Sequence, residues 1–308
     1  MNHMIEVNDL TKTYGDFTAV NHVSFTVERG SLLGFLGVNG AGKTTVINML
    51  ATLLSPDEGE VTICGATLGK EDATIRRKIG IVYQQNCLDE ILTVEENLIC
   101  RGILHGADRA GAKKQYKRLC KVMKLEEISK KKYRMLSGGQ KRRCEIAAAL
   151  MHTPEILFLD EPTTGLDPAT RQDVWKIITE LQKHENMTVF LTTHYMEEAA
   201  EADKIIILDH GNIVASGTPF EMKDRYVMDK LKLYGVERNG RELIEKIKQL
   251  GMDDIHILDS GTLEVPVAST LGALPILETA RPYIKGFEVI QGNMDDVFLN
   301  AVGREEVR

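Results

Sequence analysis

The 308-residue sequence predicts an α/β fold with a parallel sheet, followed by a smaller α+β domain. Two apolar, strand-sized runs support the sheet. The run at 32–36 leads through a glycine-rich loop into a helical pattern, and the run at 156–159 ends in two consecutive carboxylates. In the tail, strand and helix patterns follow in the order β-α-β-β-α-β. We therefore expect two domains, at 1–221 and 222–308.

The composition is that of an ordinary globular protein and excludes several classes of function. Hydrophobic residues make up 43% of the chain, enough to bury a substantial core. The net charge of −7 argues against a nucleic-acid partner. No apolar stretch approaches the roughly 20 residues of a spanning helix, and the N-terminus has no secretion signal. The five cysteines have no C-x-x-C spacing, so we expect a reducing cytosol and no zinc site.

The stretch between the first apolar strand and its helix has the spacing of a phosphate-binding loop. Glycines allow backbone N–H groups to converge on an anion, and the helix beginning at Lys43 adds its unpaired N–H groups. Lys43 would bring its positive charge close to the β and γ phosphates, and Thr44 would offer its hydroxyl to Mg²⁺ as a ligand. We predict nucleotide binding by Gly37, Asn39, Gly40, Ala41, Gly42, Lys43, Thr44 and Thr45.

The segments on either side of this loop supply two more candidates. Alternating residues at 5–7 and 23–27 predict an antiparallel β layer beside the nucleotide. Tyr14, between those strands, could stack on adenine, although half-buried packing is the commoner use of such a tyrosine. Downstream, a strand at 60–63 and a short helix ending at Lys78 lead into a buried strand at 79–83, which delivers Gln84.

Two further strand ends carry side chains that suit phosphate chemistry. The run at 156–159 ends in Asp160, placed to help hold Mg²⁺, and Glu161, which would point toward the attacking water. The strand at 187–192 is followed by Thr193 and His194. Because the carboxyl ends of parallel strands share one edge, we expect this histidine in the same crevice. The simpler alternatives are an ordinary loop start for the carboxylates and a structural role for the histidine.

A second anion-binding helix start is predicted within the stretch Leu-Ser-Gly-Gly-Gln at 136–140. Ser137 is a good N-cap residue, and the glycines at 138 and 139 leave backbone N–H groups uncovered.

These motifs stand in the order and approximate spacing of the ATP-binding cassette ATPases, and the chain resembles that family from Met4 to about Pro219. The LSGGQ stretch between two nucleotide motifs is the family's own mark. The resemblance implies ATP with Mg²⁺ as the bound nucleotide. It also implies a P-loop NTPase core with an antiparallel β subdomain and an α-helical subdomain, the latter at about 95–132.

The resemblance implies a role for each matching residue near the nucleotide. Tyr14 would stack on adenine, Glu161 would be the catalytic base, and His194 would grip the γ-phosphate. Gln84 would sense Mg²⁺ and the attacking water while linking to a membrane partner. The implied metal ligands are Thr44, Gln84 and Asp160.

The resemblance also implies a second ATPase subunit, arranged head to tail in a homodimer. In that arrangement Asp167 would cross the dimer interface. The γ-phosphate of the opposite subunit would be bound by Ser137, Gly138, Gly139 and Gln140.

The tail from residue 222 has the element order of a ferredoxin-like domain. It ends in a helix capped by Asn293, with an apolar face that includes Phe298. The tail and its ending at 294–299 resemble the C-terminal accessory domain of cassette ATPases of the daunorubicin-resistance type. The alternative is a generic appendage that only adds stability.

The function implied is an ATP-hydrolysing subunit that energises export of a drug, antibiotic or other small molecule through a separate integral-membrane permease, at the cytoplasmic face of the cell membrane. A soluble cassette ATPase of translation or DNA repair is an alternative, but those proteins carry fused cassettes, coiled coils or zinc modules and a basic face. A permease-linked ATPase used for signalling is a further alternative. The transported molecule is not encoded in these motifs.

Overall fold

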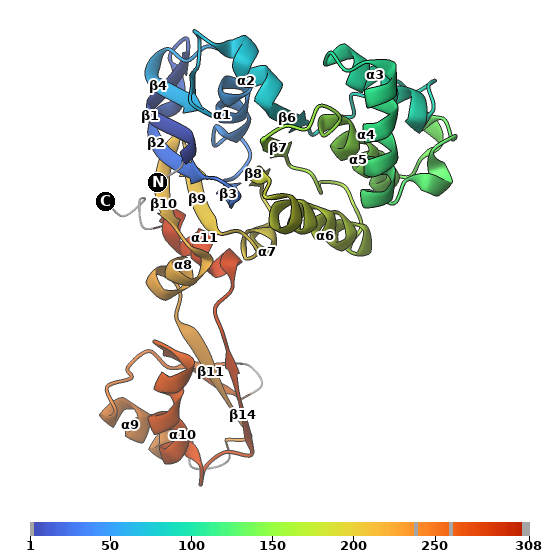
Figure 1. The fold of residues 1–308 in the computed structure, drawn as a ribbon. Coiled ribbons are helices and arrows are strands. Elements are labelled where there is room, and N and C mark those ends of the chain that lie inside the picture. Colours follow the sequence, from blue (N-terminus) through green and yellow to red (C-terminus); the bar gives the residue numbers. More distant parts are fainter. Residues whose placement is uncertain (1–2, 237–239, 259–260, 304–308) are drawn as a thin grey trace. The chain divides into compact units, whose positions relative to one another are not determined.

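The computed structural model describes residues 3–236, 240–258 and 261–303. Contacts divide the chain into two compact units, Met1–Thr218 and Pro219–Arg308, which are considered separately (Figure 1). The division falls slightly before the predicted boundary because Pro219 begins a helix, α8 (Pro219–Tyr226), of the second unit. No helix in the described ranges is long and apolar enough to cross a membrane.

The first unit is built on a six-stranded sheet with the order β10-β9-β3-β8-β7-β6. Neighbouring strands from β9 to β6 run parallel, and β10 is antiparallel to β9. Parallel strands covered on both faces are apolar throughout, which explains the continuous apolar runs in the sequence. The strands are β3 (Leu32–Leu36), β6 (Ile79–Val82), β7 (Ile156–Asp160), β8 (Thr188–Thr193), β9 (Lys204–Asp209) and β10 (Asn212–Gly217).

The predicted antiparallel layer is a second sheet with the order β2-β1-β4-β5. Its two long strands extend well beyond the alternating segments seen in the sequence, because register shifts interrupt the alternation along β1. Tyr14 pairs with Phe17 across the tight turn that joins them. The strands are β1 (His3–Tyr14), β2 (Phe17–Glu28), β4 (Glu58–Ile63) and β5 (Ala66–Thr67).

Aromatic side chains join the two sheets into one core. Phe25 of β2 lies 5.6 Å from Phe35 of β3, measured between ring centroids, and Phe35 lies 5.3 Å from Phe190 of β8. Phe158 of β7 continues the cluster at 5.4 Å from Phe190. These tilted rings contribute both apolar burial and favourable ring geometry. The core therefore holds the strands that end at the predicted site in fixed positions.

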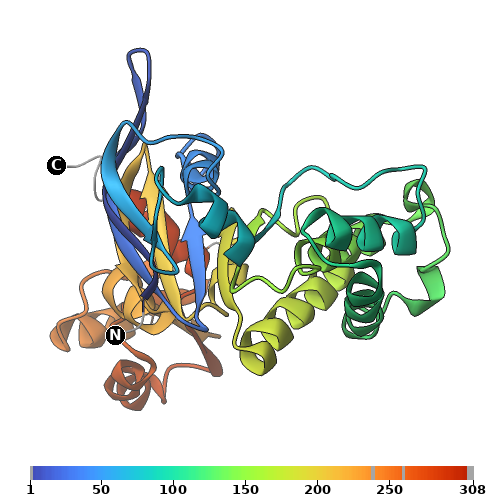
Figure 2. The ribbon, with the colours of Figure 1, turned by 45° about the horizontal axis from the view of Figure 1, so that its top comes forward.

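Helices cover the sheets and form a separate lobe. Figure 2 shows α3, α4 and α5 as green helices beside the sheets of the first unit. Ser137 caps α5 through a capping box with Gln140, as the sequence predicts. Within the predicted helical segment, α3 and α4 are followed by short 3₁₀ turns rather than one more helix. The helices of the first unit are α1 (Lys43–Leu50), α2 (Asp72–Lys78), α3 (Val94–Leu104), α4 (Arg109–Val122), α5 (Gly138–Ala149), α6 (Pro168–Glu185) and α7 (Met196–Ala199).

The second unit contains an antiparallel sheet with the order β12-β13-β11-β14. With α9 and α10 between the strands, this is the predicted β-α-β-β-α-β order, and its strand arrangement is ferredoxin-like. Leu231, Val265 and Leu243 belong to its core. The elements are β11 (Asp229–Tyr234), α9 (Gly240–Gln249), β12 (His256–Ile257), β13 (Leu263–Val267), α10 (Leu274–Ala280), β14 (Gly286–Ile290) and α11 (Met294–Gly303).

The last helix, α11, packs against α8 within the second unit. Its cap is the predicted one, because Asn293 Oδ1 accepts a hydrogen bond of 2.8 Å from the backbone N–H of Asp296. Phe298 is 9% exposed on this helix, whereas its neighbour Leu299 is 67% exposed. The apolar face predicted from the sequence is therefore buried.

We expect Phe298→Asp to destabilise the second unit by about 3 kcal/mol, since it removes a buried ring and leaves an unpaired carboxylate in its place. Leu299→Asp is the matched control and should leave stability unchanged. Urea unfolding followed by circular dichroism measures both. Equal unfolding midpoints for the two variants would show that the α8–α11 contact contributes nothing.

Candidate functional site

A cavity of about 430 Å³ lies where the β1–β2 turn, the glycine-rich loop and the ends of β6 and β7 meet. It brings together nine of the residues predicted from sequence, which come from segments far apart in the chain. Phe17 and Ala19 also line it. The nine are Tyr14, Asn39, Gly40, Gly42, Lys43, Thr44, Thr45, Gln84 and Glu161.

The glycine-rich loop needs glycine at two positions for steric reasons. A Cβ on Gly37 would lie 2.5 Å from the carbonyl oxygen of Leu208. A Cβ on Gly42 would lie 2.3 Å from the carbonyl oxygen of Ala19, and Gly42 has a φ of +107°. Ala41 is buried beneath the loop at 2% exposure and does not line the cavity. The loop is thus fitted tightly against β2 and β9.

Lys43 is held inside the loop with its amine ready for an anion. It is only 5% exposed, and Nζ donates hydrogen bonds of 2.8 and 3.0 Å to the carbonyl oxygens of Gly37 and Val38. Nζ also lies 3.8 Å from Glu161 Oε1. Burial lowers the pKa of Lys43, and the charges of Glu161 and Asp160 oppose that shift. An arriving phosphate would therefore meet a preorganised cation.

The two carboxylates at the end of β7 occupy different environments. Asp160 is buried, and its Oδ1 accepts a hydrogen bond of 2.7 Å from the Thr192 hydroxyl. Burial raises the pKa of Asp160, while the Thr192 hydrogen bond and Lys43 lower it. Glu161 has a φ of +45°, an uncommon backbone conformation for glutamate. Its backbone N–H donates to both oxygen atoms of Thr192, each at 3.1 Å.

Polar groups surround the carboxylate of Glu161 in the cavity. Its Oε2 accepts hydrogen bonds of 3.1 Å from Gln84 Nε2 and from the Thr164 hydroxyl. His194 Nδ1 approaches the same oxygen at 3.3 Å, which is ion-pair distance, although hydrogen-bond geometry is lacking. Gln84, Glu161 and His194 therefore converge on one point, as the strand ends predict. Such a group can hold and deprotonate a water molecule.

The other predicted anion-binding residues are not part of this cavity. Ser137 and Gln140 close the capping box of α5, and Asp167 caps α6 by accepting a hydrogen bond of 3.1 Å from the backbone N–H of Thr170. None of the residues at 137–140, nor Asp167, lines the nucleotide cavity. Within one chain the two anion-binding helix starts are therefore separate.

Sequence reasoning missed three buried residues that hold the site together. Thr192 hydrogen-bonds to both carboxylate-bearing residues. Glu198 of α7 accepts hydrogen bonds from two threonine hydroxyls. One belongs to Thr163, two residues after Glu161, and the other to Thr193, directly before His194. Arg142 of α5 donates to backbone carbonyls of the hydrolytic loop. A hydroxyl on a buried strand end, as in Thr192, is the only local sequence signal among them.

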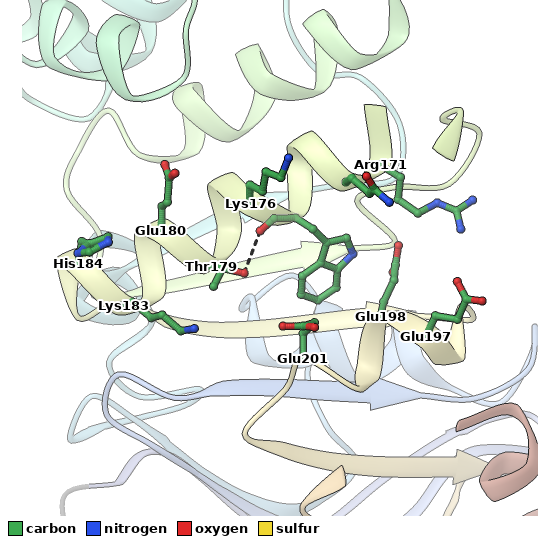
Figure 3. Close-up of a pocket in the computed structure, with 11 residues that line it drawn as sticks. Arg171, Lys176, Thr179, Glu180, Lys183, His184, Glu197, Glu198 and Glu201 are labelled. Carbon is green, nitrogen blue, oxygen red and sulfur yellow. Dashed lines mark hydrogen bonds between the residues drawn. The ribbon is translucent and has the colours of Figure 1, made fainter. Parts of the chain in front are cut away.

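A larger cavity of about 640 Å³ lies over α6 and α7 (Figure 3). Glu198 and Arg171 are among the residues that line it. The guanidinium carbon of Arg171 lies 3.8 Å from the centroid of the Tyr195 ring. No residue predicted from the motifs lines it. The converging chemistry belongs to the smaller cavity, so size does not identify the functional site here.

Comparison with known proteins gives one consistent answer. The family model for "ABC transporter" matches residues 20–164. The daunorubicin/doxorubicin resistance ATP-binding protein DrrA of Streptomyces peucetius is 37% identical over 97% of this chain and 92% of its own length. The linearmycin resistance ATP-binding protein LnrL of Bacillus subtilis (strain 168) is 35% identical, covering 98% of this chain and 99% of its own length.

Solved structures agree with the sequence relatives. The dimeric post-hydrolysis state of the ATP-binding cassette MJ0796, bound to ADP and phosphate, is 31% identical. It matches with a TM-score of 0.65 and covers 70% of this chain and 99% of its own chain. The predicted P-loop NTPase fold and ATP hydrolase activity are confirmed. From its motifs, its fold and these relatives, the chain belongs to the ATP-binding, ATP-hydrolysing proteins of the ABC transporter family.

Proposed function

We propose that this protein hydrolyses ATP to energise export of small, drug-like molecules through a separate membrane permease. The observation that carries the ATPase role is that Lys43, Gln84 and His194 all approach the carboxylate of Glu161. The export role is supported by the resistance proteins that match both units, and by a Nod factor export ATP-binding protein of Ralstonia nicotianae at 34% identity. Relatives of this kind favour transport over translation, repair or signalling.

Binding of ATP would use the loop and the β1–β2 turn. The backbone N–H groups of the loop and Lys43 would hold the phosphates, since Asn39, Gly40, Gly42 and Lys43 line the cavity. Tyr14 is 50% exposed at the cavity edge, which leaves its ring available to stack on adenine. The remaining phosphate contacts are proposed for Gly37, Asn39, Gly40, Ala41, Gly42, Thr44 and Thr45.

The oxygen donors beside the loop fit Mg²⁺. Asp160 offers a carboxylate that is oriented by Thr192. Thr44 offers a hydroxyl and Gln84 a side-chain amide, and both residues line the cavity. Carboxylate, hydroxyl and amide oxygens are the ligands that this hard cation prefers. When bound, Mg²⁺ would neutralise charge on the β and γ phosphate oxygens. We propose Thr44, Gln84 and Asp160 as the residues that hold it.

Hydrolysis would depend on Glu161 as the base for the attacking water. Its carboxylate is fixed by Gln84 and Thr164, and its backbone by Thr192. Asp160 is the alternative carboxylate, but it is buried and bonded to Thr192. His194 Nδ1 lies 3.3 Å from Glu161 Oε2, and we propose that the same ring would grip the γ-phosphate.

We expect Glu161→Gln to retain ATP binding and to lose at least about 10²-fold in kcat, because the amide cannot take a proton from water. Glu197→Gln is the matched control, since Glu197 is an exposed glutamate on α7. Steady-state phosphate release and equilibrium binding of ATP measure the two effects. Hydrolysis near the wild-type rate in Glu161→Gln would transfer the role of base to another residue, with His194 the next candidate.

Two chains would be needed to complete each site. The helix start at Ser137 does not line the chain's own nucleotide cavity, so a head-to-tail homodimer is the arrangement that would use both anion sites. Asp167 would lie at that dimer interface. The matching cassette MJ0796 is itself described as dimeric.

This shared site predicts complementation. Lys43→Ala keeps a good helix start at 137–140, and Ser137→Arg keeps a good phosphate loop, so each variant alone should be nearly inactive. A mixture should regain a fraction of wild-type phosphate release, because the hybrid has one intact site. Full activity of Ser137→Arg alone would contradict a shared site.

The permease is proposed to dock near Gln84, which would place the ATPase on the cytoplasmic face of the membrane. A groove of about 240 Å³ runs beside the segment that follows β6. Exposed Leu53 is among the residues that line it, and His105 stacks on His152 at 4.0 Å between ring centroids. A cytoplasmic helix of the permease is the occupant we propose, because most residues that line the groove are apolar or uncharged, with Arg76, Arg101 and Glu145 as the charged ones, and such a groove suits a helix.

A further inference from the structure

Arg142 is a buried cation whose hydrogen-bond partners are backbone carbonyl groups. It is 5% exposed, and in the described part of the chain it forms no ion pair within salt-bridge distance. Nη2 donates to the carbonyl oxygens of Glu161 at 2.9 Å and Asp160 at 3.2 Å. Nε donates to the carbonyl oxygen of Pro162, and Nη1 to that of Tyr83. One side chain therefore binds both the loop that carries Glu161 and the residue before Gln84.

Glu145 lies three residues further along α5 and holds the other end of the same segment. It is 7% exposed, and its Oε1 accepts hydrogen bonds from the backbone N–H groups of Cys87 at 2.9 Å and Leu88 at 3.1 Å. The Tyr133 hydroxyl donates to the same oxygen at 2.7 Å. The segment 83–88, which contains Gln84, is thus fixed at its start by a guanidinium and at its end by a carboxylate.

Both residues stand on the helix that begins with the second anion-binding site. Arg142 comes two residues after Gln140, within the first turns of α5. A movement of the helix start would be passed directly to the carbonyl groups of Glu161 and Tyr83. Burial lowers the pKa of Arg142, and the charges of Glu145 and Asp160 oppose that shift, while its hydrogen bonds go to carbonyl groups. Burying a guanidinium in this way is an expensive way to stabilise a fold. The planar guanidinium group of Arg142 suits a connection between loops, because it can donate hydrogen bonds to several acceptors at once.

We propose that Arg142 and Glu145 form a clamp that couples the start of α5, which would contact the partner's nucleotide, to the hydrolytic loops of their own chain. They are positioning residues and do not touch ATP. This inference rests on the proposed head-to-tail dimer. Through the clamp, ATP held by one phosphate loop would adjust Glu161 and Gln84 in the other site, so that the two sites respond to each other.

The clamp predicts a loss of turnover without a loss of ATP binding. Arg142→Lys keeps the charge but presents a single nitrogen, which cannot reach the carbonyl groups of both segments together. We expect kcat to fall about tenfold or more, with the dissociation constant for ATP changed less than about threefold. Arg143→Lys is the matched control, because among the described residues the hydrogen bonds of Arg143 go to the backbone carbonyls of Met123 and Lys124 within the helical lobe. It should behave as wild type.

Glu145→Gln provides a second test if Arg142→Lys folds poorly. It has the same shape and keeps an oxygen for Cys87 and Leu88, but it removes the charge opposite Arg142. We expect kcat to fall about threefold with the melting temperature unchanged, because a neutral acceptor holds the segment less firmly. The clamp is overturned if both variants keep wild-type kcat. It is also overturned if kcat falls only together with ATP affinity and melting temperature.

Hydrogen–deuterium exchange separates failure of the clamp from failure of the dimer. In the Glu161→Gln background, ATP should slow exchange at both 83–88 and 137–141. With Arg142→Lys added, protection at 137–141, which would contact the partner's ATP directly, should remain, and protection at 83–88 should weaken. If ATP protected both segments as strongly with Arg142→Lys as without it, the coupling through the clamp would be contradicted. An absence of protection at 137–141 in Glu161→Gln itself would count against the head-to-tail site, and the kcat measurements would still decide on the clamp.

Discussion

The parallel pairing of β7 with β8 is the constraint on which the site depends. It sets Asp160 opposite Thr192, and this one threonine then binds the Asp160 carboxylate and the backbone N–H of Glu161. The chain must turn sharply after Asp160, which is why Glu161 takes a positive φ that glutamate seldom adopts. The surrounding core of phenylalanine rings keeps the strands from relaxing that strain.

The same constraint explains why the hydrolytic loop needs support from several sides. A strained backbone persists only where neighbouring groups over-determine it. Thr192 of β8 binds the backbone N–H of Glu161, and Arg142 of α5 binds its carbonyl oxygen. Glu198 of α7 accepts a hydrogen bond from Thr163, two residues after Glu161. The hydrolytic loop is therefore sensitive to the position of three helices and strands at once. This sensitivity is what a motor protein needs if binding events elsewhere are to control hydrolysis.

Much of the architecture could be predicted from the sequence because its signals are local. Apolar runs located the parallel strands, glycine spacing located the phosphate loop, and alternating patterns located the ferredoxin-like order of the second unit. The contacts of Arg142 and Glu198 could not be predicted, because they join segments distant in sequence and use partners without a distinctive residue type. A carbonyl oxygen is present in every residue, so no pattern marks the one that Arg142 will bind. Strand ends in the antiparallel sheet were also missed, since register shifts break the alternation.

The central claim is that ATP is bound between two chains, and the molecular mass in solution tests it directly. Glu161→Gln should be a monomer of 34.4 kDa with ADP and should reach about twice that mass with saturating ATP and Mg²⁺. Light scattering after size-exclusion chromatography measures this, with Ser137→Arg added to the same chain as the control that should stay monomeric. A Glu161→Gln protein that binds ATP fully and remains at 34.4 kDa would contradict the account.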